Sequence, residues 1–152
     1  LTLQVSEAGH NRASRHGDVL QVAITQERLA TPDGLGGVIE LWQRREAQKV
    51  FPLRLAFCHE EMKSLRLPFP ELKIRKMRTR WGSCTRKGVV TLNLELIRMP
   101  AECIDYVVMH ELCHLVEFNH SKQFYELQSR FLPDWKERKH RLETLARAHY
   151  GL

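Results

Sequence analysis

Residues 110–120 read His-Glu-Leu-Cys-His-Leu-Val-Glu-Phe-Asn-His and constrain the fold of this chain more than any other segment. On a helix, His110 and His114 lie one turn apart and project from the same face. Two imidazoles at that separation can bind one zinc ion at about 2.0–2.1 Å each. The spacing therefore predicts a helix that presents two ligands to one metal ion.

The residues around this motif support a buried helix. Pro100 stands where proline is favoured, in the first turn. Apolar side chains follow on most sides of the helix: Ile104, Val107, Val108, Leu112, Leu115 and Val116. Burying two histidines and a glutamate there without partners would cost several kcal/mol, so the pattern favours a bound metal over two incidental histidines.

Glu111 and His120 complete the candidate site. Glu111 follows the first ligand, where its carboxylate can accept a proton from a zinc-bound water. His120 follows a predicted helix end at Asn119 and can supply a third ligand, with Glu117 or Glu126 as carboxylate alternatives. Three protein ligands and a water are typical of catalytic zinc, whereas structural zinc usually has four protein ligands.

This ligand set predicts a zinc-dependent metallopeptidase, in which Glu111 assists the attack of the zinc-bound water on a peptide carbonyl and then passes the proton to the leaving amine. The sequence does not select the group that stabilises the transition state. The candidates are Tyr106, His140, His149 and Tyr150.

The rest of the chain reads as a mixture of strands and helices. In the first half of the chain we expect a strand at 19–24, a break at 31–37 and a helical pattern at 38–65, in which Pro52 ends the helix, kinks it or starts a second one. In the second half we expect a strand at 72–78, a hairpin at 81–94, a helix capped by Ser121, and a last helix to about residue 148. A hairpin edge near the metal helix can pair with an extended peptide. Gly82 and Ser83 would allow close approach, whereas Trp81 and Cys84 have packing as an alternative role.

The formal net charge is +6, and the positive charge is concentrated in residues 73–87. Seven basic residues there have no acidic residue among them: Lys73, Arg75, Lys76, Arg78, Arg80, Arg86 and Lys87. This stretch is either a solvated face or a surface for an acidic substrate or a phosphate backbone. A weak contact with nucleic acid is therefore a second expectation.

The four cysteines include no C-x-x-C pair, and a chain of 152 residues can form one domain without disulfides. We interpret them as reduced thiols of a cytoplasmic protein. Cys113 fits a small buried side chain on the far side of the helix. No apolar run approaches the roughly 20 residues of a membrane helix, so no membrane contact is expected.

With these residues identified, the chain resembles the YgjP-like family of predicted zinc metallopeptidases. The resemblance rests on four motifs, at 80–84, 107–114, 119–124 and 132–136, together with the β-rich run 89–96, and it covers roughly residues 40–145. It implies one α+β domain over residues 1–152, zincin-like, with a small antiparallel sheet on the active-site helix and further helices. It also implies His110, His114 and His120 as ligands and Glu111 as base. Residues 1–35 match weakly as N-terminal strands, and a distant similarity connects the chain to SprT-like proteases, which act on proteins bound to DNA.

Two alternatives remain open from sequence. A nucleic-acid-associated binding module with structural zinc would need a fourth ligand, such as Cys84 or Cys113, and would tolerate Glu111→Gln. A zinc amidase acting on small molecules would share the ligands and differ in the depth of its pocket. Neither the substrate nor the oligomeric state follows from the sequence.

Overall fold

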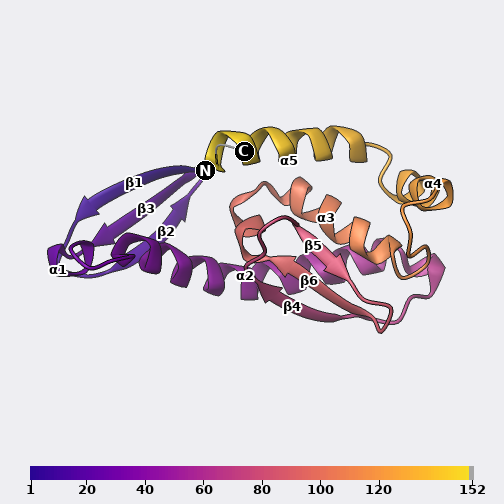
Figure 1. Cartoon of the computed structure of the whole chain (residues 1–152), viewed down its shortest axis with the longest axis horizontal. Coiled ribbons are helices and arrows are strands. Elements are labelled where there is room, and N and C mark those ends of the chain that lie inside the picture. The colour runs from indigo at the N-terminus through magenta and orange to yellow at the C-terminus, as the bar shows by residue number, and fades with distance from the viewer. Residues whose placement is uncertain (151–152) are drawn as a thin grey trace. The chain divides into compact units, whose positions relative to one another are not determined.

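The computed structural model describes residues 1–150, excepting the side chains of residues 149 and 150. The chain divides into two compact units, residues 1–47 and the part from residue 48 onward. Each unit contains a small three-stranded sheet, and the helix α2 (Gly34–Glu61) belongs partly to each (Figure 1). The expected single-domain organisation stays a prediction.

The first unit is built around the strand β3 (Val19–Ile24), which was predicted over the same residues. It pairs in parallel with β1 (Thr2–Glu7) and antiparallel with β2 (Arg12–His16). Alternate side chains of β3 are buried, with Leu20, Val22 and Ile24 each 1% exposed. This two-residue period is expected of a strand with one covered face. The short helix α1 (Gln26–Leu29) follows, capped by the Thr25 hydroxyl.

Helix α2 differs from the expectation at both ends. It begins at Gly34, inside the predicted break, and ends at Glu61, before a single 3-10 turn, η1 (Lys63–Leu65). Pro52 does not end it, although proline removes one intrahelical hydrogen bond. Phe51, Leu55 and Cys58 are at most 1% exposed, and we attribute the continuous helix to this burial.

The second unit contains the strands β4 (Glu71–Arg75), β5 (Gly82–Cys84) and β6 (Val89–Asn93), in the order β4-β6-β5. β5 and β6 form the predicted hairpin, and Gly88 takes a φ of 87° in its loop. β4, however, is parallel to β6, so the sheet is mixed and not purely antiparallel. The parallel pairing was missed because it joins strands that are not consecutive, which local turn signals do not reveal.

Helix α3 (Ala101–Cys113) follows the turn η2 (Leu94–Arg98) and is the centre of this unit. It packs against β5 and β6 and also against α4 (Lys122–Phe131) and α5 (Trp135–Tyr150) (Figure 1). Arg54 of α2 binds the buried Asp105 of α3 through two hydrogen bonds of 2.7 and 2.5 Å. The α+β class and the central helix are confirmed.

The predicted end of this helix at Asn119 was wrong. The helix ends at Cys113, His114 is its C-cap, and Asn119 has no left-handed φ. The apolar residues Leu115 and Val116, which extended the pattern, lie in the following turn, and Val116 is 46% exposed. The Ser121 cap is confirmed, since its hydroxyl accepts a hydrogen bond from the Phe124 amide at 3.3 Å. None of the described helices, even the 28-residue α2, has the combination of length and hydrophobicity that a membrane span requires.

Candidate metal centre

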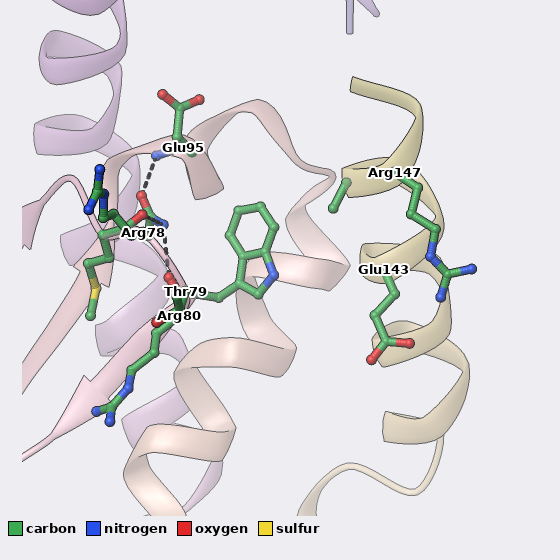
Figure 2. A pocket seen from close by; sticks show the side chains of 10 residues that line it. Arg78, Thr79, Arg80, Glu95, Glu143 and Arg147 are labelled. Carbon is green, nitrogen blue, oxygen red and sulfur yellow. Dashed lines mark hydrogen bonds between the residues drawn. The ribbon is translucent and has the colours of Figure 1, made fainter. Parts of the chain in front are cut away.

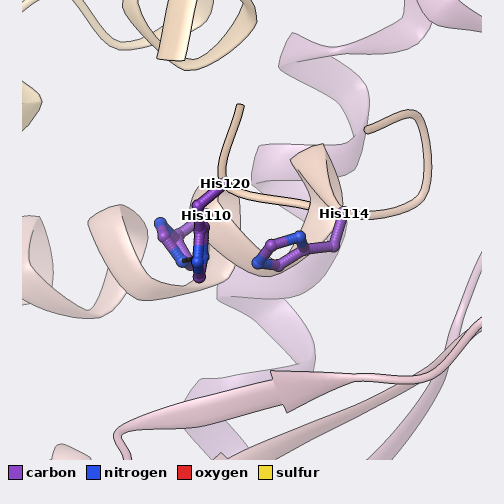
Figure 3. Close-up of side chains that lie close together, drawn as sticks. All are labelled: His110, His114 and His120. Atoms are coloured by element: carbon purple, nitrogen blue, oxygen red, sulfur yellow. Dashed lines mark hydrogen bonds between the residues drawn. The ribbon is translucent and has the colours of Figure 1, made fainter. Parts of the chain in front are cut away.

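Three histidines converge where α3 ends and the chain turns towards α4. His110 lies in the last turn of α3, His114 caps that helix, and His120 comes one residue before the Ser121 cap of α4. One nitrogen of each ring lies within 4.8 Å of the others, and the Nε2 atoms of His110 and His120 are 3.1 Å apart. Figure 3 shows the three imidazoles turned towards a common point.

Hydrogen bonds on the outer side hold two of these rings. His110 Nδ1 lies 2.8 Å from the side-chain oxygen of Gln128, and His114 Nδ1 lies 3.2 Å from the carbonyl oxygen of Glu117. Both partners are acceptors, so Nδ1 carries the proton in each ring and Nε2 keeps its lone pair. This is the arrangement found around metal-bound histidines, whose second nitrogen donates to a carbonyl or carboxylate.

Phe124 of α4 packs against all three rings from within the protein. It is fully buried, and its ring centroid lies 4.9, 4.5 and 5.0 Å from those of His110, His114 and His120. Because α4 supplies both Phe124 and Gln128, its packing against α3 sets the orientation of the cluster.

The histidines also have a suitable charge state. Burial lowers the pKa of His110 to about 4, against the raising effect of the Gln128 hydrogen bond, and the neighbouring His114 and His120 lower it further. Burial likewise lowers the pKa of His114. Both rings are therefore neutral near pH 7, which is the form that binds a metal. The donor set and its protonation fit a zinc ion.

Glu111 lies beside the cluster with an unusual environment for a carboxylate. It is only 4% exposed, and its Oε2 atom has no hydrogen-bond partner within the described part of the chain. Burial raises its pKa to about 7, and the positive charge of Arg80 opposes this shift. A carboxylate with a pKa near 7 can both take and return a proton at neutral pH.

A cleft of about 550 Å³ contains the three histidines and Glu111. Its other walls come from Arg80 and the edge strand β5 with Trp81, from Tyr106 and Val107 of α3, and from Phe118. Strand β5 passes very close to Glu111, because a Cβ atom at Gly82 would lie 3.1 Å from Glu111 Cγ. A side chain at this position would displace the carboxylate, and so glycine suits it.

The structure thus brings together the four residues selected from the sequence. Among the described residues, the cluster able to hold a metal comprises His110, His114 and His120 alone. Glu117 contributes only its backbone carbonyl, and Cys113 is fully buried with a pKa that burial raises to about 12. Cys84 lines the cleft without joining the cluster.

Of the residues considered for the transition state, Tyr106 lines the cleft, and burial raises its pKa to about 12. His140 is exposed and does not line it, and the side chains of His149 and Tyr150 lie outside the described residues. Sequence reasoning missed Gln128. It stands one helical turn after the core residue Phe124, and a polar residue at such a buried position was the available signal.

Comparison with known proteins defines the class. The chain matches a solved metallopeptidase zymogen, abylysin of Pyrococcus abyssi, at a TM-score of 0.54 and 23% identity, over 60% of this chain and 90% of that one. It also matches the metallopeptidase zymogen jannalysin of Methanocaldococcus jannaschii at a TM-score of 0.49 and 19% identity, over 57% of this chain and 84% of that one. The first of these similarities shows a zincin-like metallopeptidase fold. No curated protein matches the chain.

The family model of the YgjP-like metallopeptidase domain matches residues 1–145. The chain therefore belongs to the YgjP-like family, and the match includes the N-terminal strands that the motifs did not cover. The protein is a metallohydrolase of the zinc metallopeptidase class.

Proposed function

We propose that His110, His114 and His120 hold one zinc ion and that Glu111 is the general base in the hydrolysis of peptide bonds. The observation that carries this proposal is the position of Glu111, a buried carboxylate with an unpartnered oxygen, in the same cleft as three convergent histidines. A structural zinc site would need a fourth protein ligand, and the cluster contains three among the described residues.

When bound, zinc would supply a Lewis acid that activates water and polarises a substrate carbonyl. Glu111 takes the proton of the attacking water and returns it to the leaving amine, since burial favours its protonated form and a nearby cation favours its charged form. The Tyr106 hydroxyl keeps its proton at neutral pH and is our candidate donor to the oxygen on which charge develops.

Strand β5 is the candidate binding edge for an extended substrate. It pairs only with β6 in its sheet, and residues 82–84 line the cleft. A peptide that adds to this edge would gain backbone hydrogen bonds independent of its sequence. The volume of this cleft, about 550 Å³, and the edge strand along it suit a peptide or protein substrate better than a small amide.

The basic stretch 73–87 is exposed at all seven of its cationic residues. A secondary proposal is that this stretch makes weak contact with nucleic acid. Another is that the protein is cytoplasmic, with its thiols reduced. A shift of the salt dependence of nucleic-acid binding on replacing Arg78 and Arg86 would support the first.

The decisive experiment is elemental analysis of protein purified without a histidine tag, for the wild type and for His120→Ala. We expect about one zinc per chain in the wild type and much less in the variant. Stoichiometric zinc in both proteins would show that His120 is not the third ligand. Glu111→Gln should keep the metal and abolish hydrolysis of casein or unfolded protein, and retained turnover in this variant would refute the role of Glu111.

A further inference from the structure

A second cavity adjoins the metal cleft and shares two of its residues. It has a volume of about 370 Å³ and is bounded by the loop of residues 77–81, by Asn93 and Glu95, and by α5. Arg80 and Trp81 line both cavities. Figure 2 shows Arg78, Thr79 and Arg80 of this loop on one side, and Glu143 and Arg147 projecting from α5 on the other. A substrate in the metal cleft would therefore have this cavity as its neighbour.

Four side chains of this cavity offer hydrogen-bond donors that have no acceptor among the described residues. Arg78, Arg80 and Arg147 line it, and none of the three forms an ion pair with any residue that the structure describes. The indole N–H of Trp81 likewise lacks an acceptor in the described part of the chain. Guanidinium groups bind carboxylates in charge-assisted, often bidentate hydrogen bonds. Each of these groups can donate to a carboxylate that enters the cavity.

The loop that supplies these donors is held in place. The buried side chain of Asn93 donates hydrogen bonds to the carbonyl oxygens of Met77 and Arg80 at 3.0 and 2.8 Å. The backbone N–H of Asn93 also donates to the Trp81 carbonyl oxygen at 2.9 Å. The backbone from Met77 to Trp81 is thereby fixed before any ligand arrives, which reduces the entropic cost of binding.

Two carboxylates face the same cavity and oppose an anionic ligand. Glu95 forms an ion pair with Arg98 at 3.7 Å, so its charge is partly compensated. Glu143 stands one turn before Arg147 on α5, and its negative charge contributes to the raised pKa of the nearby Tyr106. On α5, therefore, Arg147 attracts a bound carboxylate and Glu143 repels it.

We propose that this cavity is a substrate subsite that binds a carboxylate, either an acidic side chain close to the scissile bond or the C-terminal carboxylate of the peptide. The proposal rests on the peptidase function proposed above and adds a substrate class to it. An enzyme with this subsite prefers anionic peptides over neutral peptides of the same length.

The test uses matched synthetic peptides with the zinc-loaded full chain. The parent peptides are unstructured synthetic peptides fixed before any cleavage is measured, and each is made with Asp or Asn at successive positions along its length, and with a free or amidated C-terminus. We expect kcat/KM to be roughly tenfold or more higher for the carboxylate member of one pair, the effect of one charge-assisted hydrogen bond. The pair that shows this difference in kcat/KM tells whether the bound carboxylate is an acidic side chain or the C-terminus.

Two variants on α5 give the signature of the subsite. Arg147→Gln should reduce the ratio of kcat/KM between carboxylate and neutral peptides, and Glu143→Gln should increase it. Opposite shifts from neighbouring positions on one helix would not arise from a general loss of stability. Arg141→Gln is the matched control, because Arg141 lies on the same helix, contacts Glu102 and does not line the cavity. The control should leave the ratio unchanged.

Binding separates this proposal from the proposed function. The same peptide pairs are titrated by calorimetry into the Glu111→Gln variant, where no turnover is expected. A Kd lower for the carboxylate member, weakened by Arg147→Gln in the same background, supports the subsite even if no peptide is cleaved by the wild type. Absence of cleavage alone counts against the peptidase function. Equal Kd and equal kcat/KM within every pair would overturn the carboxylate subsite and leave the peptidase function standing.

Discussion

The side-chain oxygen of Gln128 lies 2.8 Å from His110 Nδ1, and this contact joins helix α4 to the first residue of the histidine cluster. Gln128 is 1% exposed, so water cannot replace it as the acceptor. The contact fixes the Nδ1–H tautomer of His110 and directs Nε2 towards His114 and His120. Gln128 is therefore a positioning residue of the proposed zinc site.

Replacing Gln128 by leucine should weaken zinc binding by roughly 10–100-fold. Leucine, of similar volume, removes the unpartnered Nε2 atom but leaves the Nδ1–H of His110 without its acceptor, so we expect the free energy of unfolding to fall by roughly 1–3 kcal/mol. Zinc Kd is measured by competition with a chelating dye. Gln128→Glu should retain zinc binding, since a carboxylate oxygen also accepts a hydrogen bond from His110 Nδ1–H.

The matched control for this experiment is Gln123→Leu, an exposed glutamine on the same helix. It should leave the zinc Kd unchanged. If Gln128→Leu binds zinc as tightly as this control, the hydrogen bond to His110 does not position the ligand.

Gly82→Ala should slow catalysis without removing the metal. The added Cβ would lie 3.1 Å from both Glu111 Cγ and Val107 Cγ1 and 3.2 Å from the Thr91 carbonyl oxygen. Because backbone limits the adjustment, the Glu111 side chain has to shift, and a small displacement of a base lowers kcat by roughly tenfold or more. Zinc Kd and kcat are measured on the same preparation. Gly36→Ala, with no heavy atom within 4 Å of the added Cβ, serves as control, and equal kcat in both variants would contradict the expectation.

The helix period explains why much of the site follows from sequence. His110, Glu111 and His114 lie within the helix or at its cap, so their spacing alone predicts their relative positions. His120 reaches His110 and His114 because of the turn after His114. The apolar residues of that turn continue the helical pattern, so the sequence predicted a longer helix. Its selection over Glu117 was an inference from ligand number, and the loop geometry, which brings the three rings together, became visible only in the folded chain.

Contacts between segments that are distant in the sequence could not be predicted from local sequence patterns. Gln128 reaches His110 because α4 packs on α3, and no spacing rule relates residues 18 positions apart. The parallel pairing of β4 with β6 has the same origin, since β5 intervenes in the sequence. The free donors around Trp81 also required the structure, because the sequence identified the basic stretch without showing which of its side chains share a cavity.

Arg54→Leu should lower the free energy of unfolding by about 2–3 kcal/mol. It leaves the Asp105 carboxylate, 8% exposed, without the guanidinium that binds it, and an unpaired buried charge is strongly destabilising. The estimate is reduced because the Arg54 side chain is 28% exposed. Urea unfolding measures the change. Arg44→Leu, which breaks an exposed pair with Glu40 on the same helix, should cost under about 1 kcal/mol. Equal losses in the two variants would show that Asp105 does not depend on Arg54.

Glu111→Gln should stabilise the metal-free protein by an amount that grows with pH. Burial raises the pKa of Glu111 from 4.5 to about 7 in the folded state. Below pH 4.5 the carboxyl is protonated in both states and carries no penalty. As pH rises towards 7, the Glu111 carboxyl ionises in the unfolded chain but stays protonated in the folded chain. The free energy of unfolding of the wild type therefore falls by up to about 3 kcal/mol, whereas that of the variant with a neutral amide does not.

The measurement is the difference in unfolding free energy between Glu111→Gln and the wild type, both freed of metal, at several values of pH from 4.5 to 8. The lowered pKa of His110 has the opposite effect, because it makes the folded state less stable as pH falls towards 4. This effect is present in both the wild type and Glu111→Gln, so it cancels in the difference. A difference that stays constant across this range would mean that the pKa of Glu111 is not raised in the folded state. Saturating zinc should reduce the difference, because a cation beside Glu111 favours its charged form.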